Sequence, residues 1–209
     1  MRVTRYFQSC LLIEDGDIRI LVDPSAREAE NLDNFGHISG VFYTHEHGDH
    51  FDAGLAKRFI EEAFAPVYAN ENTAKLIRTD KRDKKIVVKS NQEFDVEGMK
   101  VQAKDLPHCL MWDGSQGPAN TGFKFGDKLF HPGDGKDLAN YSAQVVAVPI
   151  NGPDISIKDA LDFARQMQAK TIIPIHYDYL GGNPQVFADI AKGQGFETHV
   201  LGDGESVEI

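Results

Sequence analysis

The order of apolar and polar positions along the chain predicts many short strands and a few helices. Short apolar runs between turn residues indicate strands, and apolar positions three or four residues apart indicate helices. The first two runs, 10–13 and 18–22, are joined by Glu-Asp-Gly-Asp, a sequence typical of a hairpin turn. A second hairpin is predicted where 122–125 and 128–130 flank Gly126-Asp127. The remaining strands are predicted at 38–43, 66–69, 85–89, 94–96, 99–104, 145–150 and 171–175, with a final strand pair at 198–201 and 206–209.

Helical periodicity is found in four segments, two of which carry clear N-terminal caps. In 52–64 the apolar side chains share one face, and Asp52 precedes them as a capping residue. In 156–169, Ser156 is followed three residues later by Asp159, an arrangement close to a capping box. Shorter helices are predicted at 71–78 and from Asn183-Pro184 to Gly193 or Gly195.

The alternation of strand-rich hairpins with a few helices predicts the α/β class with mixed sheets. No linker or low-complexity tract interrupts the 209 residues, so we expect a single domain spanning 1–209. A chain of this length buries enough apolar surface to make disulfides unnecessary. Its two cysteines, Cys10 and Cys109, are therefore expected to be reduced thiols.

The net charge of −10 narrows the range of expected partners. A nucleic-acid surface needs a concentrated footprint of lysine and arginine, which this acidic balance disfavours. No apolar stretch approaches the length of a membrane span, and the first residues lack the apolar core of a signal peptide. We therefore expect a cytoplasmic protein that acts on a small molecule, without a nucleic-acid or membrane partner, and the oligomeric state stays open.

The strongest chemical signal is the segment Thr44-His-Glu-His-Gly-Asp-His50, which lies between a predicted strand and a predicted helix. Its three imidazoles and one carboxylate are ligand types that zinc prefers and that iron and manganese also accept. His45 and His47 are two residues apart on extended chain and can point the same way. Asp49 and His50, at the turn into the helix, can face a second ion. The alternative, a surface loop that is rich in histidine by chance, is disfavoured because such a string is rare.

Three further candidate ligands occur where other predicted strands end. His108 and His176 each follow a predicted strand closely, and Asp134 follows the second hairpin between two glycines. A single histidine is more often a surface or packing residue than a ligand, so each is ambiguous when taken alone. Open α/β sheets gather their sites at the carboxyl ends of strands, which favours one common site. Together the candidates suffice for two divalent metal ions: His45, His47, Asp49, His50, His108, Asp134 and His176.

This order of motifs resembles the metallo-β-lactamase fold superfamily. The shared order is a His-x-His-x-Asp-His loop, a lone histidine, a Gly-Asp pair and a late histidine, from about Asp23 to His176. Within the superfamily the chain is most similar to small bacterial hydrolases grouped with ascorbate-6-phosphate lactonase, through Asp23-Pro24 and Ile173-Pro-Ile-His-Tyr177. The resemblance implies an αββα sandwich, in which helices flank two mixed β-sheets and the site lies along one edge of the sheets.

The resemblance also implies a role for each candidate ligand. The first ion would be held by His45, His47 and His108, the second by Asp49, His50 and His176, with Asp134 bridging the two. The expected ions are zinc, with manganese(II) and iron(II) as alternatives. A hydroxide bound between the ions is the expected nucleophile, and Asp49 is the catalytic residue that orients it and moves a proton. The expected substrate is a small ester, lactone, amide or phosphoester.

Three other residues each have two open interpretations. Asp23 can accept a hydrogen bond from a ligand imidazole, or it can simply end its strand. Tyr177 can face the leaving group, or it can pack in the core. Trp112 lies in the segment 110–120, which can be a mobile wall that contacts the substrate or a static surface loop.

Three other functions remain open for the same fold. An RNA or cyclic-nucleotide phosphodiesterase is disfavoured by the acidic charge and by the lack of RNA-gripping insertions. An iron-dependent oxidoreductase is disfavoured because diiron relatives that reduce oxygen carry His-x-Glu-x-Asp, where this chain has His47. A non-catalytic metal-binding domain is disfavoured because all seven ligand positions are filled. The favoured function is therefore a metal-dependent hydrolase.

Overall fold

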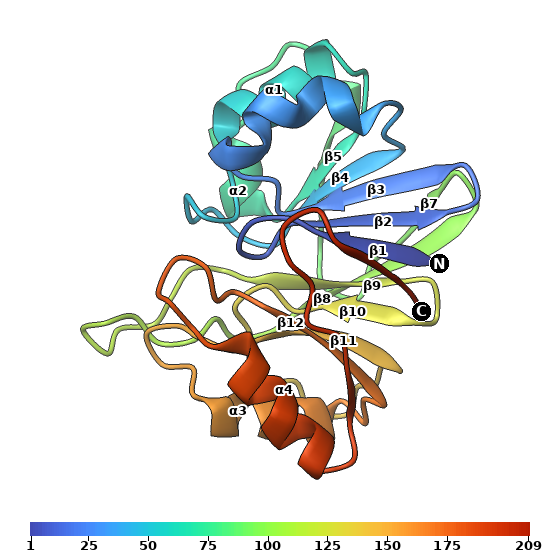
Figure 1. Cartoon of the computed structure of the whole chain (residues 1–209). Coiled ribbons are helices and arrows are strands. Elements are labelled where there is room, and N and C mark those ends of the chain that lie inside the picture. Colours follow the sequence, from blue (N-terminus) through green and yellow to red (C-terminus); the bar gives the residue numbers. More distant parts are fainter.

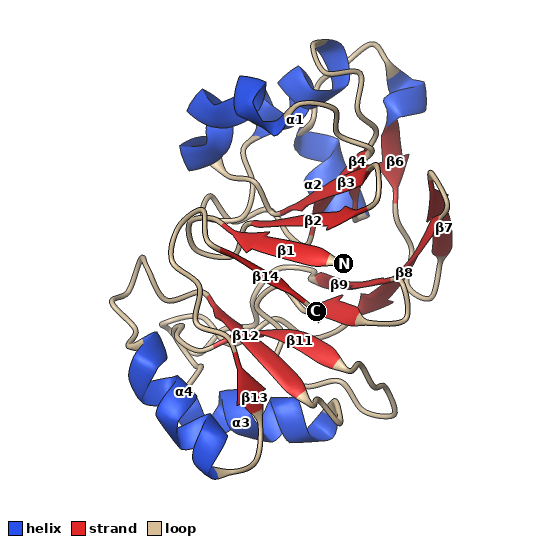
Figure 2. Ribbon diagram, turned by 45° about the vertical axis from the view of Figure 1, so that its right-hand side comes forward, coloured by secondary structure: helices blue, strands red, loops and turns tan.

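Two seven-stranded β-sheets lie face to face in the computed structural model, with helices on both outer surfaces (Figure 1). The structure describes the backbone of residues 1–209 and the side chains of residues 1–29 and 35–209. Figure 2 shows the same layers from another side, with helices outside and the two sheets between them. The α/β class with mixed sheets that the sequence pattern predicts and the αββα sandwich that the resemblance implies are both confirmed.

The first sheet is antiparallel in one half and parallel in the other. Its strands, in sheet order, are β14 (Ser206–Glu208), β1 (Arg2–Arg5), β2 (Leu11–Asp15), β3 (Ile18–Val22), β4 (Gly40–Tyr43), β5 (Val67–Ala69) and β6 (Lys85–Val87). Pairing is antiparallel from β14 to β3 and parallel from β3 to β6. The hairpin of β2 and β3 is the first hairpin predicted from the sequence, and it is confirmed.

The second sheet repeats this division into two halves. Its strands, in sheet order, are β13 (Glu197–Thr198), β12 (Thr171–Ile175), β11 (Val145–Pro149), β10 (Leu129–His131), β9 (Thr121–Phe125), β8 (Met99–Asp105) and β7 (Glu93–Val96). Pairing is antiparallel from β7 to β10 and parallel from β10 to β13. The predicted hairpin around Gly126-Asp127 is therefore confirmed as β9 and β10.

The helices begin at side chains that accept hydrogen bonds from otherwise free backbone amides. Asp52 caps α1 (Ala53–Glu61), and Ser156 forms the predicted capping box with Asp159 at α3 (Ile157–Gln166). The other helices are α2 (Glu71–Leu76), α4 (Pro184–Gly193) and the 3-10 helices η1 (Ala26–Phe35) and η2 (Arg82–Lys84). Helices α1 and α2 cover the first sheet, whereas α3 and α4 cover the second (Figure 1). Over the part of the chain that the structure describes, no helix has the length and apolar character needed to cross a bilayer.

Aromatic rings from the inner faces of both sheets form a shared apolar core. Phe42 of β4 stacks on Tyr68 of β5 with ring centroids 4.3 Å apart. The same ring meets Phe123 and Phe125 of β9 edge-on, at 5.0 Å and 5.5 Å. Two more apolar clusters lie between the outer face of each sheet and its helices. Strands buried on both faces have nearly continuous apolar sequences, which explains the run at 145–150.

The predicted strand pair at the end of the chain is wrong. β13 joins the second sheet beside β12, whereas β14 joins the first sheet beside β1. The sequence pattern also did not predict β1, or the 3-10 helix η1. Pairing of short edge strands depends on neighbours that are distant in the sequence, and local propensity does not encode those neighbours.

The topology brings the loops that carry the candidate ligands to one edge of the sandwich. β4, β10 and β12 each pair in parallel with a neighbour, and carboxyl ends of parallel strands lie at the same edge of their sheet. The loop after β8 joins them through an isolated bridge between His108 and Gly135. Loops from both sheets therefore meet at one place.

Replacing Phe42 with alanine tests how strongly the shared core holds the sheets together. We expect Phe42→Ala to lower the free energy of unfolding by about 3–5 kcal/mol, because it removes a fully buried ring. Phe64→Ala is the matched control, since that ring is 64% exposed, and it should cost less than about 1 kcal/mol. Urea unfolding followed by circular dichroism measures both. Equal losses in the two variants would contradict this description of the core.

Candidate metal centre

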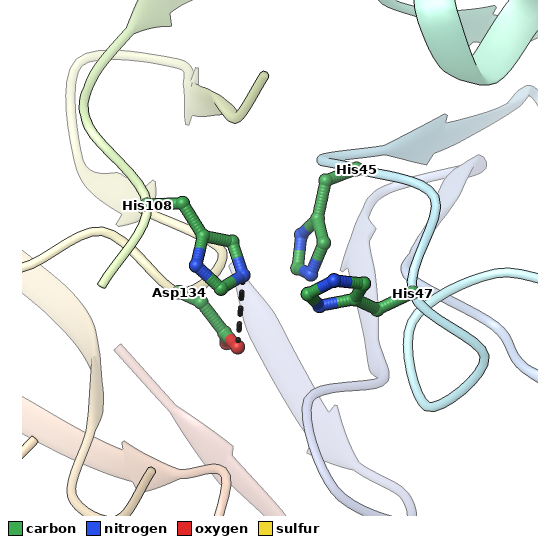
Figure 3. Close-up of side chains that lie close together, drawn as sticks. All are labelled: His45, His47, His108 and Asp134. Carbon is green, nitrogen blue, oxygen red and sulfur yellow. Dashed lines mark ion pairs between the residues drawn. The ribbon is translucent and has the colours of Figure 1, made fainter. Parts of the chain in front are cut away.

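All seven predicted ligand residues lie at the ends of strands and face one another. Their candidate ligand atoms form two groups, each with its atoms within 4.8 Å of one another. Figure 3 shows His45 and His47, from the loop after β4, facing His108 and Asp134 from two other loops. The groups are His45, His47, His108 and Asp134, and Asp49, His50 and His176.

Asp134 belongs to the first group and also contacts the second. Its Oδ1 atom is 3.0 Å from His50 Nε2. Its Oδ2 atom is 3.2 Å from His176 Nε2 and 3.5 Å from His108 Nε2, the contact drawn in Figure 3. The second carboxylate, Asp49, has Oδ2 at 3.3 Å from His176 Nε2. Asp134 thus contacts imidazoles of both groups.

Backbone carbonyl groups fix the orientation of two buried imidazoles. His108 donates from Nδ1 to the carbonyl oxygen of Cys109 at 2.7 Å, and His176 donates from Nδ1 to that of Asn151 at 2.6 Å. A carbonyl oxygen can only accept, so Nδ1 carries the ring proton in both residues. The Nε2 atom of each ring points into the cluster, and in the neutral ring it offers a free lone pair there.

Asp23 fixes the other two buried imidazoles, one of them through Thr44. His50 donates from Nδ1 to Asp23 Oδ2 at 2.8 Å. The Thr44 hydroxyl donates to the same carboxylate oxygen at 2.7 Å and lies 3.0 Å from His45 Nδ1. Because the hydroxyl gives its only proton to Asp23, it accepts the hydrogen bond from His45. Of the two interpretations of Asp23, the structure therefore favours the contact with a candidate ligand imidazole.

Five buried atoms of the cluster lie close to one another but make no well-oriented hydrogen bond with any described residue. A buried polar atom left unpaired costs about 1–3 kcal/mol, so several in one place call for a further partner. Imidazole nitrogen and carboxylate oxygen are preferred ligands of zinc and related divalent ions, which therefore fit this cluster. The unpaired atoms are Nε2 of His45, His50, His108 and His176, and Oδ1 of Asp134.

The carboxylates make the cluster a site that stabilises positive charge. Burial alone would lower the pKa of His176, but Asp134 and Asp49 outweigh burial and raise this pKa to about 9. Burial likewise opposes ionisation of Asp134, but the charges of His176 and His50 hold its pKa well below the usual range. His45 differs, because burial and then the charge of His50 lower its pKa. Its imidazole is therefore neutral, which is the form that binds a metal.

Three residues of the site have left-handed backbone conformations, which are uncommon for residues other than glycine. The φ angles are 58° at Gln8, 49° at Asp23 and 61° at His176. Each such conformation costs about 1 kcal/mol or more. Each also turns the chain shortly after a strand and directs a side chain into the cluster. Strain of this kind often occurs at binding sites.

Gly133 permits the close approach that brings Asp134 to the centre. Its φ angle is 60°, which favours glycine. A Cβ atom at this position would lie 2.3 Å from Asn120 Oδ1 and 2.7 Å from Thr44 Oγ1. Any larger residue would therefore push the Asp134 loop away from the strand that carries Thr44.

Gln8 contacts the site although no sequence pattern predicts it. Its Nε2 atom donates to Asp49 Oδ2 at 3.1 Å, and its Oε1 atom accepts from the backbone N–H groups of Asp178 and Tyr179, both at 3.1 Å. Its own carbonyl group accepts from the backbone N–H of His176 at 2.9 Å. The partners of its side chain are 41 to 171 residues away in the sequence. The sequence around Gln8 therefore contains no motif that would indicate its role. Gln8 ties Asp49 to the segment after β12.

A cavity of about 540 Å³ opens onto the cluster. His47, Asp49, His108, Asp134 and His176 face it, so it gives a small molecule access to the candidate ligands. Its walls come from several loops and are mainly apolar, with Phe7, Met111, Trp112, Pro153, Tyr179 and Leu180 among them.

Trp112 and Tyr177 were both predicted as possible substrate contacts, but only Trp112 lines the cavity. Trp112 lines the cavity, and its contact with a substrate stays a prediction. Tyr177 is not part of the described cavity wall. Its hydroxyl donates to the Leu201 carbonyl oxygen at 2.7 Å, and the Arg5 guanidinium lies 4.1 Å from its ring centre. Tyr177 therefore has the packing role, the second of its two interpretations.

A known protein family matches most of this chain. The sequence model of the β-lactamase superfamily domain matches residues 2–176, a range that includes every candidate ligand. The chain belongs to the metallo-β-lactamase superfamily. Membership agrees with the αββα fold and with a histidine- and aspartate-rich centre at the ends of strands.

Three relatives illustrate what this superfamily member resembles. Protein Rv0786c of Mycobacterium tuberculosis is 28% identical over 182 residues and 84% of both chains. A UPF0173 metal-dependent hydrolase of Alkaliphilus metalliredigens is 26% identical over 223 residues and 96% of both chains. The solved structure of Igni18, a metallo hydrolase of Ignicoccus hospitalis, gives a TM-score of 0.79 at 21% identity, covering 99% of this chain and 97% of that one. These findings support a metal-dependent hydrolase, whereas the narrower similarity to the ascorbate-6-phosphate lactonase group stays a prediction.

Replacing Asp23 with asparagine tests whether its contacts prepare the centre for metal. The amide offers one acceptor oxygen to donors that now share two, so His50 or Thr44 loses a partner. We expect zinc affinity to fall about 10- to 100-fold, as measured by competition with a chromophoric chelator. Asp127→Asn, in the exposed turn between β9 and β10, is the matched control and should bind zinc like the wild type. An unchanged affinity in Asp23→Asn would contradict this role.

Proposed function

We propose that this chain is a hydrolase that uses two divalent metal ions, preferably zinc, to cleave a small ester, lactone, amide or phosphoester. The observation that carries the proposal is the set of four buried imidazoles with hydrogen-bonded Nδ1 atoms and unpartnered Nε2 atoms. They lie beside two carboxylates at the floor of an open cavity. A cluster without a role in binding would not need so many buried, unpaired ligand atoms beside solvent-accessible space.

The assignment of residues to ions follows the two groups of ligand atoms. His45, His47 and His108 would hold one ion, and Asp49, His50 and His176 would hold the other. Asp134, which contacts imidazoles of both groups, would be shared. When bound, the ions would make a water molecule acidic enough to act as the nucleophile and would polarise the bond under attack.

Asp49 is the residue best placed to move a proton. Its carboxylate faces the cavity, and Gln8 Nε2 and His176 Nε2 both contact Oδ2. No described residue forms a hydrogen bond with Oδ1. We assign to Oδ1 the acceptance of a proton from the attacking water, and to Gln8 the orientation of the carboxylate.

The cavity supports a small-molecule substrate. Its volume of about 540 Å³ lies in the range typical of pockets for small ligands. The chain carries a net charge of −10, which disfavours the polyanionic surface of RNA as a substrate. Hydrolysis of small esters, lactones, amides and phosphoesters by metal-loaded protein, and not by metal-stripped protein, is the expected result of a screen.

Asp49→Ala tests the proposed mechanism. We expect wild-type protein to bind two metal equivalents, and the variant to bind the second ion more weakly because one ligand is lost. We also expect kcat to fall by about 10²- to 10⁴-fold, the usual effect of losing a general acid–base group. Elemental analysis and steady-state kinetics measure the two effects. Asp189→Ala, on the exposed side of α4, is the control and should match the wild type in both measurements. Two bound metal equivalents together with undiminished turnover in Asp49→Ala would contradict the mechanism.

Gln8→Glu tests the positioning of Asp49 separately. The substitution keeps an oxygen for the N–H groups of Asp178 and Tyr179 but removes the amide donor to Asp49. We expect kcat to fall about 10- to 100-fold and its acidic limb to move to higher pH, because the new carboxylate cannot donate to Asp49 and its charge raises the pKa of Asp49. A purely structural role would leave both the kcat and the pH profile of the folded fraction unchanged.

A further inference from the structure

Arg27 is the only lysine or arginine among the described residues that line the cavity. Its guanidinium lies 4.1 Å from the centre of the Phe7 ring, which also lines the cavity. Stacking on an aromatic face leaves the N–H edge of a guanidinium free to donate. Within the described side chains, no carboxylate lies within ion-pair distance of Arg27. The cavity wall therefore presents one positioned donor group for an anion.

The rest of the wall is apolar and open to solvent. Trp112 is 72% exposed and Tyr179 is 71% exposed, and both line the cavity. Leu180 lines it as well and is 39% exposed. Large apolar side chains that gather at the mouth of a pocket mark a binding surface. They fit the apolar body of a ligand whose charged end reaches Arg27.

We propose that the cavity selects substrates with an apolar body and one carboxylate, and that Arg27 binds this carboxylate; the inference rests on the hydrolase function proposed above. A guanidinium edge matches the two oxygens of a carboxylate with two parallel hydrogen bonds. The bound group lies apart from the bond that is cleaved. Arg27 is therefore a specificity-determining residue.

A carboxylate fits this wall better than a phosphate monoester. A phosphate dianion calls for more than one positive partner, and Arg27 has no second cation beside it in the described wall. Lys136, a cation near Asp134 in the sequence, is not part of this wall. It is paired with Asp154, whose Oδ2 atom lies 2.8 Å from Lys136 Nζ. The single positive charge of Arg27 therefore matches the single negative charge of a carboxylate.

The proposed reaction is hydrolysis of an ester that carries the carboxylate at its far end. The oxygen of water forms a bond to the acyl carbon, and the bond from that carbon to the alcohol oxygen breaks. One proton from the water goes to the leaving alcohol oxygen, and the other is released as the new carboxylic acid ionises. The carboxylate bound by Arg27 takes no part in these bond changes.

A substrate pair that differs only in charge tests the selectivity. The probes are mono-4-nitrophenyl esters of adipic, suberic and sebacic acid, which span a range of lengths, and the methyl esters of their free carboxyl groups. With zinc-loaded wild type we expect kcat/KM to be about 10- to 100-fold higher for the best carboxylate probe than for its methyl ester. Arg27→Met should abolish this ratio, and Arg27→Lys should restore part of it. Arg78→Met, an exposed arginine outside this cavity, is the matched control and should keep the wild-type ratio.

Ligand binding gives a readout that does not depend on turnover. Trp112 is the only tryptophan of the chain, so its fluorescence reports on the cavity. The probes are 4-phenylbutyrate, its uncharged amide and 3-phenylpropyl phosphate, each titrated into zinc-loaded protein. We expect 4-phenylbutyrate to bind at least about 10-fold more tightly than the amide, and Arg27→Met to reduce this ratio about tenfold. The carboxylate of 4-phenylbutyrate can also bind zinc. That contribution is the same in wild type and in Arg27→Met, so the difference between the two proteins reports on Arg27 alone.

The outcomes separate this inference from the hydrolase function. Hydrolysis of both esters with equal kcat/KM, unchanged by Arg27→Met, overturns the carboxylate selectivity and leaves the hydrolase function standing. Arg27-dependent binding of 4-phenylbutyrate without hydrolysis of any ester supports the selectivity and counts against the hydrolase function. Tighter Arg27-dependent binding of 3-phenylpropyl phosphate than of 4-phenylbutyrate overturns the choice of a carboxylate.

Discussion

Hydrogen bonds to the Nδ1 atoms of four buried imidazoles are the interactions on which the rest of the site depends. Each acceptor holds one ring in a single orientation and places the ring proton on the side away from the cluster. In the neutral ring, the lone pair of the opposite nitrogen, Nε2, is then available to bind a metal ion in a buried, charged environment. Without these bonds the rings could turn, and a carbon atom or an N–H group could face the centre. The arrangement of the candidate ligands is therefore set by groups outside the ligand set, among which Asp23 serves two rings.

The acceptors and the ligands come from both sheets, so the packing of the sandwich determines the dimensions of the centre. The His45–His50 loop follows β4 of the first sheet, whereas His108, Asp134 and His176 follow strands of the second. The aromatic contacts of Phe42 with Phe123 and Phe125 hold these two sheets at a fixed separation. The left-handed conformations at Asp23 and His176 then turn the chain where each strand ends. Stability gained in the apolar core offsets this local strain.

The clustering of the candidate ligands could be predicted from the sequence, because these residues have a distinctive chemistry and follow apolar strands. The His45–His50 loop is rare as a string, and His108, Asp134 and His176 share its position at strand ends. Gln8 and Thr44 could not be predicted, because their contribution is a hydrogen-bond geometry that residue type does not reveal. The same limit explains the wrong pairing of the last two strands, whose partners lie near opposite ends of the chain. Strand existence follows from local pattern, whereas partner choice follows from the whole fold.

The most direct test of the account is the tautomeric state of the histidine rings, measured by two-bond ¹⁵N–¹H correlation spectra as zinc is added. In the zinc-loaded protein we expect His45, His50, His108 and His176 to carry a proton on Nδ1 alone and to show shifted Nε2 resonances. His131 is an internal control with the opposite tautomer, because its Nε2 donates to the Ser9 carbonyl oxygen at 2.8 Å, and zinc should leave its tautomer unchanged. Protons on the Nε2 atoms of the four rings in the zinc-loaded protein, or shifts confined to His37 and His199, would contradict the account.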